Sequence, residues 1–219
     1  MIALCGLALT NSVKAVDRAD LDFRIRKLGL KLDALQAKPD KRVPAESLQK
    51  AQGIILLDRT KAGFLFAYQG GSGVVLVKDA KTQRWTAPAF VSASEASLGF
   101  QIGGEQSFVV ILVMNTNALQ SLARGNFNFA GEATGTAGNN SSGVESGISS
   151  NEPLTLVYTD REGLYGGATI KGDALSPDTS ADVAYYGQYL SMNEILFDHK
   201  VTPTPAAEDL SRKIDQYSK

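Results

Sequence analysis

The chain has 219 residues, of which 43% are apolar and 21% are charged, and its formal net charge is −1. These values are typical of a folded domain with its own core, and they exclude a strongly basic nucleic-acid-binding protein. The charges are unevenly distributed: residues 1–84 contain 15 Lys/Arg against 8 Asp/Glu, and residues 85–219 contain 7 against 15. Either one surface faces an anionic partner, or the two halves intermingle and their charges cancel.

The first segment, 1–15, is an apolar block followed by a short polar stretch. Val13 and Ala15 have the spacing of the −3 and −1 residues of an export cleavage site, so we expect a truncated export signal here. A buried first helix or strand is the alternative. Cys5, the only cysteine, lies in this segment, so cleavage after Ala15 would leave no thiol and no disulfide. We therefore expect an exported protein, either periplasmic or peripherally associated with a membrane.

An amphipathic N-terminal helix is expected within residues 16–42. Its apolar side chains recur at intervals of three and four residues, at Leu21, Ile25, Leu28, Leu32 and Leu35. Such a helix lies either on a membrane, with its cations at headgroup level, or against a protein core. Phe23 and Leu30 interrupt the opposite, polar side, so we favour packing against a core.

After this helix the pattern changes to β-structure. A short helix at 44–52 comes first. Apolar or alternating runs then predict strands at 54–58, 63–68, 73–79, 107–115, 126–131, 153–159 and 163–172. Further helices are expected at 116–125, 191–198 and 206–217, and the small, polar residues 135–152 are typical of an exposed loop. Because strands and helices do not alternate, the predicted fold class is α+β, with a curved, mainly antiparallel sheet, helices at both ends and one central helix.

The sequence GGSG at 70–73 raises the question of a phosphate-binding loop. A P-loop would end its glycines in Gly-Lys-Ser/Thr and open a helix, and a dinucleotide fingerprint also requires a following helix. Here Gly73 leads into the apolar run VVLV instead. We therefore expect residues 70–73 to form the turn of a β-hairpin.

Residues capable of catalysis are scarce. His199 is the only histidine and Cys5 the only cysteine, so a zinc site of the His/Cys type cannot be assembled. No G-x-S-x-G motif is present, and carboxylate pairs such as Asp160/Glu162 fall in predicted turns. We predict no enzymatic activity, no metal and no cofactor. Nucleic acid is not expected as a partner, because basic and aromatic residues do not alternate.

Ordered sequence blocks cover most of the chain from Pro44 to Leu210. They are AQGIILLD (51–58), TKAGFLFAYQGGSGVVLVKD (60–79), RWTAPAFVS (84–92), LGFQIGGEQSFVVILVMN (98–115), GNFNFAGEATGTAG (125–138), GLYGGATIKG (163–172) and YYGQYLSMNEIL (185–196). In this order the blocks resemble the SYLF domain family, with the domain placed at 43–219. The resemblance implies a compact α+β domain that binds anionic phospholipids and has no known enzymatic activity.

Two family features do not carry over directly. The family often has Gly-Pro-x-Gly-Arg where this chain has AGNNSSGV (137–144), so the resemblance implies no headgroup contact from that arginine here. Some eukaryotic members bind actin, which we do not expect of a chain with an export signal.

Cations around the predicted hairpin are the candidate lipid contacts. We expect hairpin pairing to bring the end of one strand close to the residues that follow the other, gathering Arg59, Lys61, Lys78, Lys81 and Arg84. Arg24, Lys27 and Lys31 of the N-terminal helix are further candidates. Each cation near an anionic surface contributes about 1 kcal/mol. The alternative is that these are ordinary solvated strand ends.

The function predicted from the sequence is a non-enzymatic phospholipid-binding domain of the bacterial cell envelope. It would attach peripherally to the anionic phospholipid membrane surface through basic residues. The alternative is a protein-interaction or scaffold module with an envelope protein as its partner. Trp85, the only tryptophan, belongs either to the interface or to the core, and its large apolar area favours the core.

Overall fold

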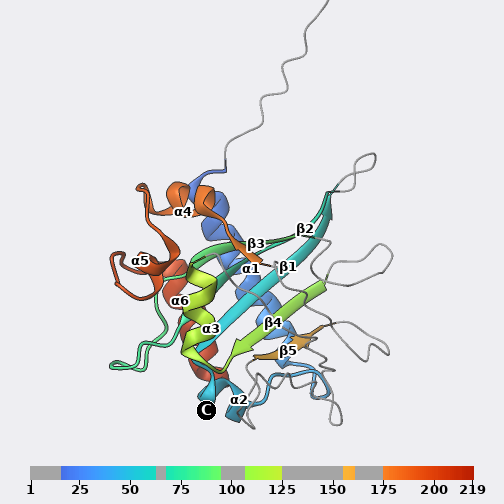
Figure 1. The fold of residues 1–219 in the computed structure, drawn as a ribbon. Coiled ribbons are helices and arrows are strands. Elements are labelled where there is room, and N and C mark those ends of the chain that lie inside the picture. The colour runs from blue at the N-terminus through green and yellow to red at the C-terminus, as the bar shows by residue number, and fades with distance from the viewer. Residues whose placement is uncertain (1–15, 63–67, 95–106, 125–154, 161–174) are drawn as a thin grey trace, which may run out of the picture.

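A six-stranded sheet runs through the centre of the molecule (Figure 1). The structure, a computed structural model, describes residues 16–62, 68–94, 107–124, 155–160 and 175–219. Its strands are β1 (Gly53–Ala62), β2 (Tyr68–Val77), β3 (Ala89–Ser94), β4 (Ser107–Val113), β5 (Thr155–Thr159) and β6 (Leu175–Pro177). They lie in the order β5-β4-β1-β2-β3-β6, and every neighbouring pair is antiparallel. The predicted α+β class with an antiparallel sheet is therefore confirmed.

Helices cover both faces of this sheet. They are α1 (Arg18–Gln36), α2 (Ala45–Lys50), α3 (Thr116–Ala123), α4 (Thr179–Tyr186), α5 (Met192–Leu196) and α6 (Pro205–Tyr217). One core cluster joins α1, α2, α4 and α6 to one face, and a second joins α3 and α5 to the other. Figure 1 shows α1 passing behind the sheet and α3 in front of it. The result is three layers, with the two cores separated by the sheet.

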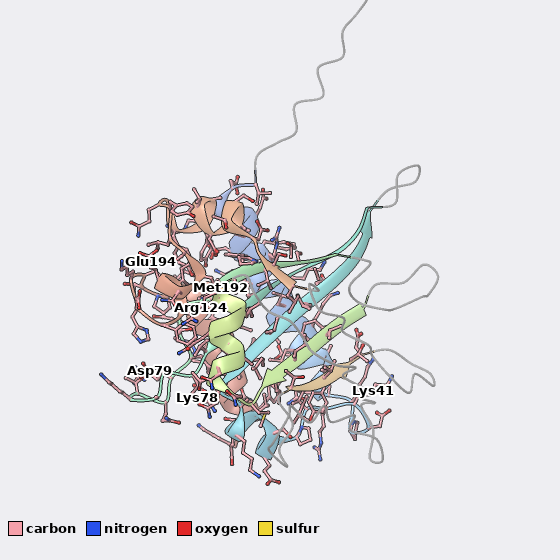
Figure 2. All side chains as sticks on the ribbon, in the orientation of Figure 1. Lys41, Lys78, Asp79, Arg124, Met192 and Glu194 are labelled. Atoms are coloured by element: carbon pink, nitrogen blue, oxygen red, sulfur yellow. The ribbon has the colours of Figure 1, made fainter. Side chains whose placement is uncertain are left out.

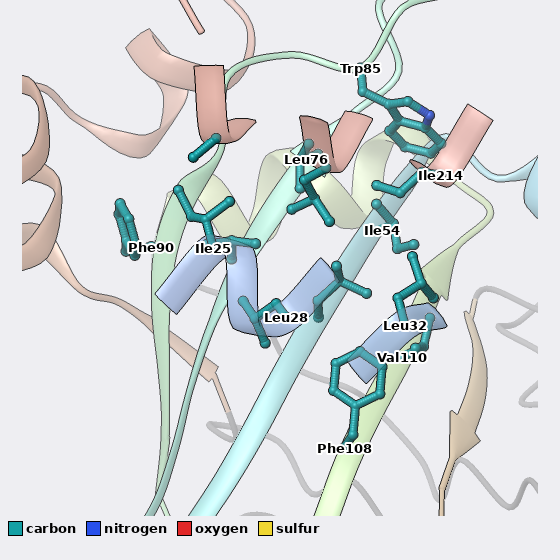
Figure 3. Packing of buried hydrophobic residues seen from close by; sticks show 14 of the residues in the cluster. Ile25, Leu28, Leu32, Ile54, Leu76, Trp85, Phe90, Phe108, Val110 and Ile214 are labelled. Carbon is teal, nitrogen blue, oxygen red and sulfur yellow. The ribbon is translucent and has the colours of Figure 1, made fainter. Parts of the chain in front are cut away.

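Helix α1 is an integral part of the first core. Asp17 caps its first turn through the Asp20 backbone N–H, and the side chain of Asp20 accepts from the Asp17 N–H in return. The five apolar side chains of the predicted stripe are fully buried, among them Leu28 and Leu32 (Figure 3). Core packing, the interpretation favoured from the sequence, is thus confirmed. Trp85 also belongs to this cluster and is only 5% exposed.

Polar contacts lock α1 to the C-terminal helices. The Tyr185 hydroxyl on α4 donates to Asp22 Oδ1 at 2.7 Å and also contacts Thr204, which caps α6. At the other end of α1, Asp33 pairs with Lys213 and accepts from the Tyr217 hydroxyl at 2.9 Å. Residues more than 160 positions apart in the chain are thereby joined. Helix α1 is held by its neighbours along its length.

The GGSG residues do not form a turn. Residues 70–73 lie inside β2, where Gly73 pairs with Leu57 of β1 and with Val91 of β3. A Cβ on Gly73 would lie 2.0 Å from the Leu56 carbonyl oxygen, so only glycine allows the strands to approach this closely. The hairpin expected around these glycines is therefore wrong: residues 68–77 form one strand, which pairs with β1, and Gly73 serves close packing between strands.

The other elements expected from the sequence are confirmed only in part. The helices expected at 44–52, 116–125, 191–198 and 206–217 are confirmed within a few residues. Strands β3 and β6 and helix α4 were not predicted. The expected signal at 1–15, the strands at 126–131 and 163–172 and the loop at 135–152 lie outside the described residues, as do residues 63–67.

Candidate functional site

The register of the β1–β2 hairpin separates the five cations that we expected to gather. Arg59 pairs with Gly71 and Lys61 with Gln69, near the turn, whereas Lys78 follows Val77, which pairs with Gly53 at the opposite end. Lys78 lies seven residues beyond Gly71, the partner of Arg59, which is a span of about 23 Å along the strand. The expected convergence is therefore wrong, because in a hairpin the end of one strand meets the beginning of the next. The backbones of Arg59 and Lys61 are described but their side chains are not, so their contact with lipid stays a prediction.

Lys78 stabilises the fold at the end of the sheet away from the hairpin turn (Figure 2). Its Nζ donates to the carbonyl oxygens of Leu48 and Gln49, at 3.2 and 2.8 Å, in the last turn of α2. It also lies 4.9 Å from the centre of the Trp85 ring, a cation–π distance. Burial lowers the pKa of Lys78 from its ordinary value. An ammonium committed in this way is a poor candidate for a headgroup contact.

Lys81 and Arg84 lie on the exposed loop between β2 and β3. Asp79 organises this loop by accepting from the backbone N–H groups of Lys81 and Thr82, at 3.0 and 2.6 Å. The hydrogen bonds from Thr82 are the main reason why the pKa of Asp79 is lowered, with a smaller contribution from His199. His199 Nε2 lies 2.9 Å from Asp79 Oδ2, so the only histidine of the chain is paired with a loop carboxylate. Nothing here resembles a general base beside a nucleophile.

The three candidate cations of α1 form a basic flank, defined as Arg24, Lys27 and Lys31. Lys27 Nζ lies 2.8 Å from one carboxylate oxygen of Asp58 on β1, and Lys31 Nζ lies 2.5 Å from the other. Asp58 itself is only 5% exposed. Two ammonium groups thus satisfy one buried carboxylate, as burial of a charge requires.

Arg24 completes the flank nearer to β3 and β6. Its Nη1 lies 3.9 Å from Asp178 Oδ2, and its guanidinium lies 5.9 Å from the centre of the Phe90 ring. Of the eight predicted cations, the structure brings these three together along one side of α1. Lys81 and Arg84 share a different loop, and Lys78 caps a helix.

The outward side of α1 carries Phe23 and Leu30, the two apolar residues that interrupt its polar side and that counted in the sequence against a helix lying on a membrane. Phe23 is 68% exposed and Leu30 is 66% exposed, and a spacing of seven residues places them on one side of the helix. Arg26, which is exposed, and Lys27 lie between them in the sequence. These four residues form what we call the outward face of α1. The signal was visible in the sequence, but it could be interpreted only once the opposite stripe was known to be buried.

A second buried carboxylate, Asp182 on α4, has no cation beside it in the contacts described. It is 1% exposed and accepts from the Phe90 backbone N–H at 2.9 Å. Burial raises the pKa of Asp182 to about 7, against the opposing effect of this hydrogen bond. The group fastens α4 to β3 and faces the same core as α1.

The described part of the chain contains neither a metal-binding cluster nor a membrane-spanning helix. Within those residues, no group of three or more His, Cys, Asp or Glu side chains is arranged to hold a metal ion. None of the helices seen there combines the length and the hydropathy needed to cross a bilayer.

Comparison with known proteins places this arrangement in a family. The model of the Ysc84 family, described as "Las17-binding protein actin regulator", matches residues 94–217. The chain is 32% identical over 183 residues to "SH3 domain-containing YSC84-like protein 1" of Homo sapiens, covering 82% of this chain and 53% of that protein. The Xenopus laevis protein of the same name is 33% identical over 173 residues, with coverage of 78% and 51%.

A yeast relative is more distant. "LAS seventeen-binding protein 3" of Saccharomyces cerevisiae is 27% identical over 180 residues, covering 80% of this chain and 39% of that protein. The chain thus spans about half the length, or less, of the curated relatives it matches. The family match at 94–217 spans β4, β5 and β6 and the helices α3 to α6. The chain belongs to the Ysc84 family, whose domain is the SYLF domain.

Proposed function

We propose that this protein is a non-enzymatic phospholipid-binding domain of the bacterial cell envelope, attached peripherally to anionic headgroups. The observation that carries the proposal is the outward face of α1. Phe23 and Leu30 are exposed there with Arg26 nearby and with Lys27, which also pairs with Asp58, on a helix that is hydrogen-bonded to its neighbours at both ends. Apolar side chains flanked by cations are what an interfacial helix presents to a membrane.

An apolar side chain immersed in the membrane and a cation near its anionic surface contribute comparable free energies of binding. Full burial of a Phe or Leu side chain contributes about 1.5–3 kcal/mol, and partial immersion contributes less. Each cation near an anionic surface adds about 1 kcal/mol, and this contribution falls with salt. Neither kind suffices alone for stable attachment, so binding should require both anionic lipid and the apolar pair.

The cellular location follows from the same proposal. The apolar block at 1–15, with Val13 and Ala15 at signal-cleavage spacing, supports export to the periplasm or to a membrane surface. Mass spectrometry of the mature N-terminus tests this directly. A mature chain beginning at Val16 supports export, and retention of residues 1–15 in the isolated protein counts against it.

A second candidate function is a protein-interaction or scaffold module of the envelope. It is favoured by the names of the relatives, of which the yeast protein is a LAS seventeen-binding protein. A partner recovered from envelope extracts in high salt, by a chain that does not bind vesicles, would support this candidate over lipid binding.

Vesicle flotation tests the lipid proposal. The wild-type chain should float with vesicles of phosphatidylcholine and phosphatidylglycerol, less so as salt rises, and hardly at all with phosphatidylcholine alone. F23S/L30S should reduce binding at least about tenfold, because two apolar anchors are lost. The matched control is V183S/Y189S, which removes two exposed apolar side chains on and beside α4. Equal flotation of the wild-type chain with neutral and with anionic vesicles would contradict the proposal.

A further inference from the structure

A row of polar side chains crosses the face of the sheet that α1 covers. Its members stand opposite one another on β1, β2, β3 and β6, and they are Asp58, Ser72, Ser92 and Ser176. Opposed residues of neighbouring strands point to the same side of a sheet. The adjacent row on the same face contains Leu56, Val74 and Phe90, which belong to the core beneath α1. On β1, β2 and β3 the polar row therefore follows the apolar row of this core, whereas on β4 the residue opposite Asp58 is the buried Phe108.

The hydroxyl groups of this row are free to bind. Asp58 is buried, Ser72 and Ser92 are half-buried, and Ser176 is exposed, so access increases toward β6. Among the described residues, no side-chain hydrogen bond engages any of the three serines. Half-buried hydroxyls normally find a partner in the protein, in water or in a ligand. We call Ser72, Ser92 and Ser176 the serine row.

The basic flank of α1 reaches both ends of the serine row. Lys27 and Lys31 meet Asp58, the neighbour of Ser72. Arg24 lies against Phe90 and Asp178, which are each two residues from a member of the row. Because adjacent strands lie about 4.8 Å apart, Asp58 and Ser92 are about 10 Å from each other. A small anion between these ends would be within reach of flexible lysine and arginine side chains.

The hydrogen bonding of this region is incomplete. The three cations of the basic flank pair with two carboxylates, Asp58 and Asp178, and the buried Asp182 beside Phe90 is a third acidic group of this region. Arg24 Nη1 is buried and has no hydrogen-bond partner, although Asp178 lies at ion-pair distance. A phosphomonoester carries nearly two negative charges at neutral pH and has three strong acceptor oxygens. Such a group would supply the acceptor that Arg24 Nη1 lacks.

We propose that the serine row and the basic flank form a binding site for a phosphomonoester. Ser72 and Ser92 would donate to its oxygens from the sheet, and Arg24 with Lys31 would donate from α1. The inference rests on the proposed function in that a lipid headgroup is one source of the phosphoryl group, and a free phosphate ester is the other. The outward face of α1 would contact the bilayer while this flank holds the headgroup.

The test combines a soluble probe with vesicles. Glycerol 3-phosphate is titrated into the isotope-labelled full chain, and amide shifts are followed by NMR. Vesicles of phosphatidylcholine with phosphatidic acid, a monoester, are compared with vesicles containing phosphatidylglycerol, a diester. The test variant is S72A/S92A, which removes two hydroxyls and leaves each Cβ in place. The matched control is K81Q/R84Q, which removes two cations from the separate β2–β3 loop.

We expect glycerol 3-phosphate to shift amides near residues 24–31, 72, 92 and 176. S72A/S92A should weaken its binding about tenfold, the loss of two modest hydrogen bonds, and should abolish any preference for phosphatidic acid over phosphatidylglycerol. K81Q/R84Q should bind the soluble probe as the wild-type chain does. Unchanged melting of S72A/S92A shows that the fold is intact.

Two results would overturn the inference: unchanged probe binding by S72A/S92A, or shifts confined to the 79–84 loop. Vesicle binding without any binding of glycerol 3-phosphate also overturns it, and leaves the proposed lipid function standing. Conversely, binding of glycerol 3-phosphate at the serine row without vesicle attachment supports this site for a free phosphate ester. In that case it is the proposed function that fails.

Discussion

The two sides of helix α1 carry the same kinds of residue and serve different purposes. On the inner side, Leu21 to Leu35 repeat at helical spacing, and all five members of this stripe are fully buried against the sheet. On the outer side, Phe23 and Leu30 are two-thirds exposed. The inner leucines contribute to folding through the area they remove from water. The outer pair contributes almost nothing to folding, because it stays in contact with water. The free energy of burying these two side chains is therefore available for membrane binding.

The same distinction applies to the cations. Lys78 stabilises the end of α2, and Lys27 and Lys31 neutralise a buried carboxylate. Arg26 is exposed, with its guanidinium 3.8 Å from a partly exposed Asp209. A charge or an apolar side chain therefore acquires its role from the surface to which the fold assigns it. Substitutions can distinguish residues that support the fold from residues that are available for binding.

The largest expected effect comes from L28A, compared with L30A two residues away. Leu28 is fully buried, so its truncation should lower the free energy of unfolding by about 2–5 kcal/mol. Leu30 is 66% exposed, so L30A should change stability by less than about 0.5 kcal/mol and should weaken vesicle binding instead. Urea denaturation measures both. Equal losses of stability would mean that the two sides of α1 do not differ as described.

A second prediction concerns the buried carboxylate beside the inner side of α1. The pKa of Asp182 is raised from 3.8 to about 7 by burial, so between these values the folded chain holds a proton that the unfolded chain releases. The free energy of unfolding should consequently fall as pH rises from about 4 to 7 and remain reduced above that range. D182N keeps an oxygen for the Phe90 N–H and carries no charge.

The variant D182N should flatten this pH dependence and should gain up to about 4 kcal/mol relative to the wild-type chain above pH 7. Urea denaturation of both chains at pH 5 and pH 8.5 measures the change. D198N is the matched control, since Asp198 is exposed. An unchanged slope in D182N would show that the carboxyl is not the group responsible.

The smallest effect is expected from K78M. The substitution retains most of the apolar stem but leaves the carbonyls of Leu48 and Gln49 without their donor, so stability should fall by about 1 kcal/mol. Vesicle affinity should change less than twofold. The control K81M removes an exposed loop cation and should leave stability unchanged. If K78M lost vesicle binding while its stability was unchanged, Lys78 would be a membrane contact and not a support of the fold.

Local patterns predicted much of the fold. The stripe of α1, the Ser191 cap of α5 and the apolar run of β4 are each specified by neighbouring residues, and each forms as expected. Strand β3 was missed because AFVSAS is small and weakly patterned, and its place is set by pairing with β2. The GGSG turn was wrongly predicted for a related reason. A glycine required by a neighbouring strand gives the same sequence signal as a glycine required by a turn.

The candidate site was less predictable, because it depends on register. The basic flank meets Asp58 only because the even-numbered residues of β1 face α1. The serine row exists only because three strands align Ser72, Ser92 and Ser176. Neither alignment can be derived from residue spacing in one strand. A shift of the pairing register by one residue would turn every side chain of that strand to the opposite face of the sheet.

The most direct test of the outward face is tryptophan fluorescence on vesicles. In a W85F background, which removes the buried indole, F23W places a probe on the outward face and Y189W places one on the exposed chain after α4. Addition of anionic vesicles should shift the emission of F23W to shorter wavelength and leave that of Y189W unchanged. A shift in Y189W with none in F23W would contradict the account, since the membrane would then contact a different surface.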